Sequence, residues 1–191
     1  QVKTAEQARR WWATAGAADP SHPYLTKKRL APHGLRQRDT MLLVPLFYDG
    51  ELVNIERIYP DGAKKALFGG RAKGVAGLVG KLVDADRVLI AEGWATAAAL
   101  YEAIGVPVVV ARNADNLEPV ARRLRQRLPD NVAITLAADD DRFTDGNPGT
   151  TKARLAALAI GAKVLMPTFC ADCQRCTDFA DVVLCRKERS L

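Results

Sequence analysis

The chain has 191 residues, a hydrophobic content of 48% and a formal net charge of +6 at pH 7. This length fits one ordinary domain or two small ones, and the apolar content suffices for a packed core, which excludes a disordered chain. The longest apolar runs are strand-sized and bounded by charged or turn residues, so no membrane span is expected. With no recognisable signal peptide after Gln1, we expect a piece of a longer cytoplasmic protein.

The first part of the chain, residues 1–83, is predicted to form a small α+β subdomain. A helix is expected over TAEQARRWWATA, ended by Gly16, followed by an irregular basic stretch. The segments MLLVPLFY, ELVNIERIY and KKALFGG have strand composition, and Asp-Gly pairs at 49–50 and 61–62 separate them as hairpin turns. The pattern predicts an antiparallel meander with a helix in front.

The second part, residues 84–191, alternates strand-like and helix-like segments. RVLIA, VPVVVA, VAITLAA and KVLMP have strand composition, and a helix-like segment separates each from the next. This alternation predicts an α/β fold with a small, mostly parallel, Rossmann-like sheet flanked by helices. Ligands of such sheets bind at the carboxyl ends of the strands.

Acidic residues follow two of these predicted strands directly. Glu92-Gly93 follows RVLIA, and Asp139 to Asp141 follow VAITLAA. Carboxylates gathered at one sheet edge suit Mg²⁺ or Mn²⁺, which take oxygen ligands. In an alternative interpretation, Glu92 caps a helix and the three aspartates form a solvated loop paired with Arg142 and Lys152. Two acidic strand ends in one α/β unit favour the cation site.

The pattern LIAEGWATAAAL, followed later by LAADDDR, resembles the Toprim domain of topoisomerases, bacterial primases and certain nucleases. This resemblance covers about residues 86–167. The segments HPYLTKKRLAPHGL, LLVPLFYDGELVNIERIYPDGAKKALFGGRAKG and TDFADV are further similar to the primase-type Toprim proteins of phages and plasmids. With them, the resemblance extends over nearly the whole chain.

The resemblance implies a catalytic site of Glu92, Asp139 and Asp141, with Asp140 as a spacer. All three acids are implied ligands of Mg²⁺ or Mn²⁺, and Glu92 is the implied general acid or base. The implied activity is that of a DNA primase core, a nucleotidyltransferase that makes short primers from nucleoside triphosphates on single-stranded DNA. A helicase or another replication domain is an implied partner. A metal-dependent nuclease and a noncatalytic nucleic-acid-binding or partner-docking module remain alternatives.

One position departs from the pattern of bacterial replicative primases, which carry another acid four residues after the glutamate. Here that position is Thr96. The site would then bind fewer or weaker metals, or would recruit Asp178 or Asp181 from the segment TDFADV. In the alternative interpretation, these two aspartates are ordinary loop acids.

Basic residues surround the glycines of PDGAKKALFGGRAKG. Glycine lets a phosphate chain approach the backbone N–H groups closely, so this segment is a candidate for binding nucleotide or template. A hairpin edge protected by lysines is the equally weighted alternative. The candidate substrate-binding residues are Lys64, Lys65, Arg71, Lys73, Arg142 and Lys152.

The four cysteines lie near the end of the chain. Cys170, Cys173 and Cys176 have C-x2-C-x2-C spacing, and Cys185 follows nine residues later. Four thiolates at such spacing can make a tetrahedral zinc site. The first three cysteines also have the spacing of iron–sulfur ligands, but the fourth cysteine is not at the usual distance from them. Free thiols in a loop are a further alternative.

Overall fold

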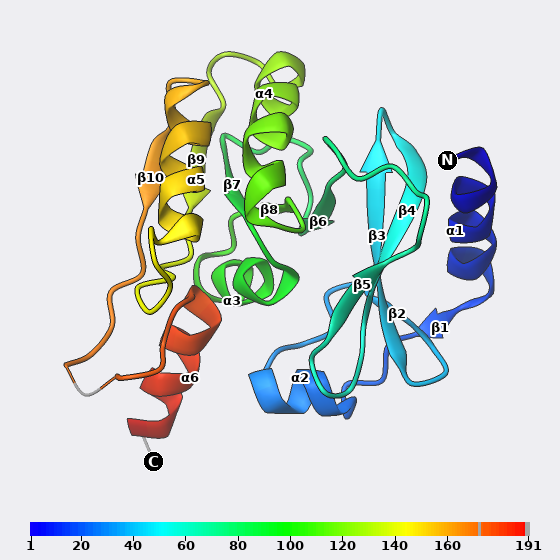
Figure 1. Ribbon diagram of the computed structural model, residues 1–191, viewed down its shortest axis with the longest axis horizontal. Coiled ribbons are helices and arrows are strands. Elements are labelled where there is room, and N and C mark those ends of the chain that lie inside the picture. Colours follow the sequence, from blue (N-terminus) through cyan, green and yellow to red (C-terminus); the bar gives the residue numbers. More distant parts are fainter. Residues whose placement is uncertain (172, 190–191) are drawn as a thin grey trace. The chain divides into compact units, whose positions relative to one another are not determined.

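The computed structural model describes residues 1–171 and 173–189, with side chains through Cys185. The chain divides into two compact units, Gln1–Gly77 and Leu78–Leu191, and the sequence-based boundary was placed at residues 83 and 84. Figure 1 shows an antiparallel sheet in the first unit and a mostly parallel sheet flanked by helices in the second. The predicted α/β fold class is confirmed. No helix of the described residues is long and apolar enough to cross a membrane.

The first unit is an antiparallel sheet in the order β1-β2-β3-β4-β5 with a helix packed against it. Asp49 and Gly50 join β3 to β4, and both have positive φ, at 55° and 81°, as a tight hairpin requires. The elements are α1 (Val2–Thr14), β1 (Gly16–Ala17), α2 (Pro23–Lys28), β2 (Arg36–Arg38), β3 (Met41–Tyr48), β4 (Glu51–Ile58) and β5 (Lys64–Ala66).

Helix α1 buries an apolar stripe against the sheet. Ala8 is fully buried in a cluster with Leu43, Leu52, Ile55 and Leu67, and both tryptophans of the helix pack at its margin. The stretch expected to be irregular instead contains α2 and β2. Helix α2 was not predicted because it spans only six residues and gives too short a sequence pattern. Its first turn is capped by the His22 side chain, which accepts a hydrogen bond from the Tyr24 N–H and is not among the usual capping residues.

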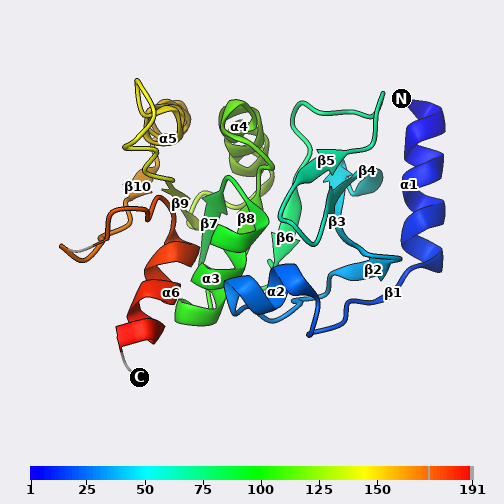
Figure 2. The same cartoon turned by 60° about the horizontal axis from the view of Figure 1, so that its bottom comes forward.

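The second unit has a five-stranded sheet in the order β10-β9-β7-β8-β6. β7 pairs in parallel with β8 and with β9, and β9 pairs in parallel with β10. Figure 2 shows α4 and α5 on one face of this sheet and α3 and α6 on the other. The elements are β6 (Gly77–Val79), β7 (Arg87–Ala91), α3 (Trp94–Ile104), β8 (Val108–Val110), η1 (Ala114–Asn116), α4 (Leu117–Arg127), β9 (Ala133–Ala137), α5 (Pro148–Leu158), β10 (Lys163–Leu165) and α6 (Phe179–Arg189).

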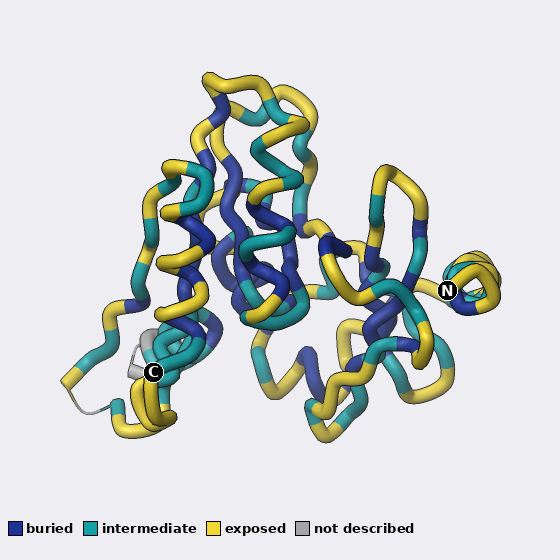
Figure 3. The backbone as a smooth tube through the Cα atoms, turned by 45° about the horizontal axis from the view of Figure 1, so that its top comes forward, coloured by how far each residue is buried: buried dark blue, intermediate teal, exposed yellow. Residues whose placement is uncertain are grey.

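The core of the second unit lies between the central strands and the helices, where the backbone is coloured as buried in Figure 3. In α3, every residue from Trp94 to Leu100 is buried, and four alanines let the helix pack closely on the sheet. Trp94 is only 1% exposed, so it is a core residue. The site described next is therefore built on a rigid, well-packed helix and two central strands.

Candidate functional site

The carboxyl ends of the central strands form a topological switch point. Ala91 of β7 lies opposite both Val110 of β8 and Ala137 of β9, so the three strands end at the same level. After β7 the chain enters α3 on one face of the sheet, and after β9 it enters α5 on the other face. A crevice forms where neighbouring parallel strands diverge in this way, and ligands of α/β sheets bind there. Glu92 and Asp139 follow these two strands directly or nearly so.

Asp139 is the most strongly perturbed acid of this crevice. Its partial burial, together with the negative charges of Asp178, Glu92 and Asp141, raises its pKa from 3.8 to about 8. Burial is the largest cause of this rise, and the nearby negative charges add to it. The structure thus brings the three predicted catalytic acids together and adds Asp178 to them.

Thr96, which occupies the position of the missing acid, contacts this cluster directly. The side chain is only 2% exposed, and its hydroxyl donates a hydrogen bond of 3.3 Å to Asp139 Oδ1. This bond favours the ionised carboxylate and opposes the rise of the Asp139 pKa. A neutral donor therefore takes the place of a further negative charge.

Asp141 is held by the amino-terminal end of α5. Its Oδ2 accepts from the Gly149 N–H at 2.8 Å. A Cβ atom on Gly149 would meet Asp139 O at 2.7 Å and Asp141 Oδ2 at 2.8 Å, so only glycine permits this approach. Asp140, the predicted spacer, instead accepts from the Asn147 side-chain amide at 2.6 Å. The three consecutive aspartates thus have three different environments.

The loop between Asp141 and α5 is a series of turns. The N–H of Thr144 donates to Asp141 O, and the N–H of Asn147 donates to Thr144 O. Asn147, with a left-handed φ of 41°, then caps α5 by accepting from the Thr150 N–H. The Thr150 hydroxyl donates back to Asp139 O at 3.1 Å. This loop is tied to the acidic strand end at several points.

Asp178 and Asp181 have different positions at the start of α6. Asp178 accepts from the Asp181 N–H at 2.8 Å, and Asp181 accepts from the Thr177 N–H at 3.0 Å. Asp178 acts on the pKa of Asp139 more strongly than any other charge, whereas Asp181 acts on Cys176. Of the two acids proposed to supplement the site, the structure places Asp178 beside it.

The donor set of the crevice consists of carboxylate oxygens, which suit a hard divalent cation. A cation there would offset the repulsion that adds to burial in raising the pKa of Asp139, so the residues present fit such an ion. Among the described residues, groups of three ligand atoms within 4.8 Å of one another occur only in the thiol cluster. The acids therefore lie further apart than the thiols of that cluster.

Comparison with known proteins identifies the family of this chain. A family model described as the Toprim domain matches residues 87–188. The chain belongs to the Toprim family. Two curated relatives, each called DNA primase TraC from Escherichia coli, are 37% identical over 158 residues and 34% identical over 180 residues. The alignments cover 77% and 88% of this Toprim chain, which spans only 15% and 12% of the relatives.

Solved primase structures share the fold of this Toprim chain. A structure of bacteriophage T7 lagging-strand DNA polymerase interacting with primase domains matches with a TM-score of 0.61 and 16% identity, covering 92% of this chain and 88% of the other. The DnaG catalytic core matches with a TM-score of 0.54 and 15% identity, covering 98% and 74%. The predicted resemblance to primase-type Toprim proteins is thereby confirmed.

Arg142 and Lys152 make contacts away from the three aspartates. The Arg142 guanidinium donates to Cys173 O and lies 4.5 Å from the Phe169 ring centroid. Lys152 Nζ lies 3.0 Å from Asp115 Oδ1. The alternative in which both cations pair with the acidic triplet finds no support in these contacts. A substrate role for Arg142 and Lys152 stays a prediction.

In the first unit, the predicted basic residues surround one anchored loop, Leu67–Lys73. Lys64 and Lys65 are exposed on edge strand β5. The Arg71 guanidinium lies 3.2 Å from the ring centroid of Tyr48, and its Nε donates to Lys73 O. Basic side chains thus lie on β5 and on this loop.

Buried polar side chains hold the Leu67–Lys73 loop in place. Asn54, only 1% exposed, donates to Arg71 O at 2.9 Å and accepts from the Leu67 N–H at 3.2 Å. A Cβ atom on Gly70 would meet Asn54 Nδ2 at 2.4 Å. The loop presents Phe68 to solvent, 100% exposed. Sequence reasoning missed Phe68, although an aromatic residue between basic residues and glycines was a usable signal.

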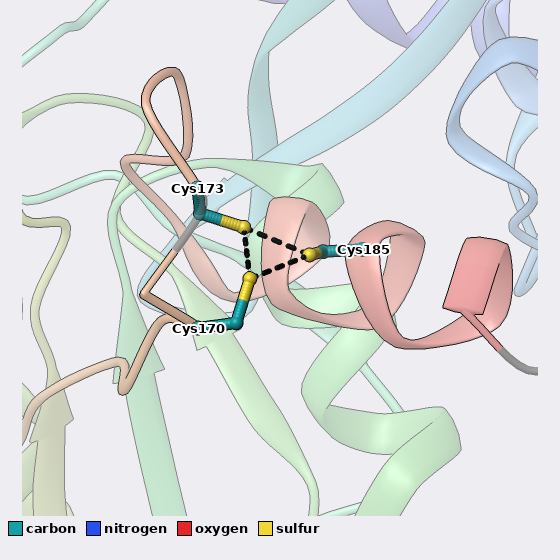
Figure 4. Close-up of side chains that lie close together, drawn as sticks. All are labelled: Cys170, Cys173 and Cys185. Carbon is teal, nitrogen blue, oxygen red and sulfur yellow. Dashed lines mark hydrogen bonds between the residues drawn. The ribbon is translucent and has the colours of Figure 1, made fainter.

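The cysteines are brought together at the end of the second unit. The Sγ atoms of Cys170, Cys173 and Cys185 contact one another, and Figure 4 shows two of them on a loop and the third on α6. Hydrogen bonds from Cys170, Cys185 and Cys176 lower the pKa of the Cys173 thiol to about 7. All four thiols are free, and three of them are in mutual contact rather than spread along a loop.

Proposed function

We propose that this chain is the catalytic core of a primase, which joins nucleoside triphosphates into short primers on single-stranded DNA. The observation that carries the proposal is the crevice in which burial and the charges of Asp178, Glu92 and Asp141 raise the pKa of Asp139 to about 8. Phosphoryl transfer needs bound cations and charge neutralisation more than covalent help from the protein. The names of the curated relatives and the shared primase fold support this choice among Toprim activities.

In the proposed reaction, the 3′-hydroxyl oxygen of the primer attacks the α-phosphorus of the incoming nucleotide, and pyrophosphate leaves. Divalent cations, when bound, lower the pKa of the hydroxyl and neutralise charge on the leaving group. Asp139 and Asp141 are the proposed ligands of Mg²⁺ or Mn²⁺, and Asp178 is a further candidate. Glu92, the first residue after β7, is proposed to accept the proton of the hydroxyl or to share a cation.

The anchored basic loop of the first unit is the proposed nucleic-acid contact. Lys64, Lys65, Arg71 and Lys73 would neutralise phosphates, and their contribution would weaken with added salt. Phe68 offers a free aromatic face on which a base can stack, which is how proteins hold single strands without sequence preference. In this proposal, Asn54 keeps the aromatic side chain from collapsing onto the protein. A helicase or another replication domain is the proposed partner.

The test incubates the chain with single-stranded DNA, labelled nucleoside triphosphates and Mg²⁺ or Mn²⁺. The proposal expects short oligonucleotides from the wild type and from Asp140→Asn, and none from Asp139→Asn or Glu92→Gln. Shortening of the DNA without new oligonucleotides would identify a nuclease instead. Titration with Mn²⁺ accompanies the assay because it reports the acidic site separately from synthesis. A wild type that neither reacts nor binds Mn²⁺ would be a noncatalytic module.

A further inference from the structure

A cluster of thiols lies outside the acidic crevice. The distances between sulfur atoms are 2.8 Å for Cys170 and Cys173, 2.8 Å for Cys173 and Cys185, and 3.2 Å for Cys170 and Cys185. The three come from a tight turn, in which the Cys173 N–H donates to Cys170 O, and from α6. Cys176, three residues after Cys173 in the sequence, also acts on the pKa of the Cys173 thiol. Three of the four cysteines therefore meet sulfur to sulfur, and Cys176 is the remaining thiol of the same segment, outside this mutual contact.

We propose that these four thiolates bind one structural zinc ion. Ligand sulfurs about 2.3 Å from a tetrahedral zinc lie about 3.7 Å from one another. The observed separations of 2.8 to 3.2 Å let an ion enter once the sulfur atoms move apart by about 0.5 to 1 Å. Soft thiolate ligands in a tetrahedral set select zinc over the hard cations that suit the acidic crevice.

Two other uses of the thiols fit the geometry less well. A disulfide joins only two sulfurs, at about 2 Å, and leaves the mutual contact of three unexplained. In a [4Fe–4S] cluster each thiolate binds a different iron atom, and in a [2Fe–2S] cluster only two thiolates share one, so three ligand sulfurs lie further apart than those of one shared ion. Mutual contact of Cys170, Cys173 and Cys185 favours a single metal ion.

The zinc site would stabilise the segment that carries Asp178. Asp140 N–H donates to Thr177 O at 2.7 Å, and the Arg142 guanidinium donates to Cys173 O. These two bonds connect the cysteine-bearing segment to the residues that follow β9. Helix α6 begins right after Asp178 and carries Cys185 on a later turn. Closing the thiols around an ion therefore fixes both ends of this segment without placing zinc in the crevice.

The first experiment measures the metal content of the chain purified under reducing conditions, by mass spectrometry of the intact protein and by elemental analysis. The expected result is about one zinc ion per chain, lost from Cys173→Ser and Cys185→Ser and retained by Thr168→Ser. Thr168 is an exposed residue of the same segment, so its substitution controls for handling. Replacement with Co²⁺ should give the strong charge-transfer absorption of tetrahedral thiolate coordination.

Three results would each overturn the proposal: iron with visible absorption, a native disulfide, or protein that is purified without bound metal and whose four thiols all react freely. The effect on the crevice is measured separately, by Mn²⁺ titration and hydrogen exchange before and after chelation of zinc. Faster exchange over residues 177–185 is expected, with protection in β7 unchanged. The zinc proposal does not rest on primer synthesis, because metal content is measured without a substrate. An inactive chain that contains zinc would refute only the proposed function.

Discussion

Replacing Asp139 with asparagine should stabilise the metal-free protein. The carboxyl keeps its proton in the folded chain up to a pH of about 8, whereas the unfolded chain releases it above 3.8. Between these two values the unfolded state loses a proton that the folded state retains, so stability falls as pH rises. Asparagine cannot ionise, and its side-chain oxygen can still accept the hydrogen bond from Thr96.

The shift in pKa sets the size of this effect. A change from 3.8 to about 8 corresponds to about 5 kcal/mol at pH 8 and about 2 kcal/mol at pH 5. For a chain of this length, each kcal/mol moves Tm by about 2 to 4 °C. At pH 8 in EDTA, we therefore expect Asp139→Asn to melt on the order of 10 °C above the wild type. The gain should be clearly smaller at pH 5.

Circular dichroism melts at both pH values measure this difference, with Asp140→Asn as the matched control. Asp140 accepts from the Asn147 amide, and asparagine keeps a side-chain oxygen that can accept the same bond, so this substitution should change Tm little at either pH. Adding Mg²⁺ at pH 8 should raise the Tm of the wild type more than that of Asp139→Asn. The raised pKa of Asp139 is refuted if Asp139→Asn melts below the wild type at pH 8, or if its Tm exceeds that of the wild type by the same amount at both pH values.

Three further substitutions test other contacts. Gly149→Ala should lower the free energy of unfolding by about 1 to 3 kcal/mol and weaken Mn²⁺ binding, because the added Cβ atom would collide with Asp141. An unchanged Tm and an unchanged Mn²⁺ titration would contradict this. Thr96→Val should move Mn²⁺ binding to higher pH, since the bond that opposes the raised pKa of Asp139 is lost, and Thr96→Ser should behave as wild type. Phe68→Ala should weaken binding of single-stranded DNA about 5-fold or more, with Tm unchanged and Phe68→Trp as the control; equal affinities would exclude stacking.

The longer strands and helices could be predicted because alternating apolar segments and Asp-Gly turns are local signals, whereas short elements such as α2 and β2 could not. The acids Glu92, Asp139 and Asp141 could be predicted to meet because parallel strands end at one edge of their sheet. The position of Asp178 could not, since it depends on how α6 packs after an irregular segment. Phe68 was missed for a similar reason: the exposure of an aromatic side chain follows from the distant Asn54, which fixes the loop.

The turns between Asp141 and Gly149 act as a spacer of fixed length. Each turn begins where the previous one ends, and the last must deliver the Gly149 N–H to the Asp141 carboxylate at 2.8 Å. An added or deleted residue would break that closure even though much of the loop is exposed. Relatives that keep both residues should vary in side chains here and conserve the residue count. An engineer who wishes to insert a tag or label should choose another surface loop.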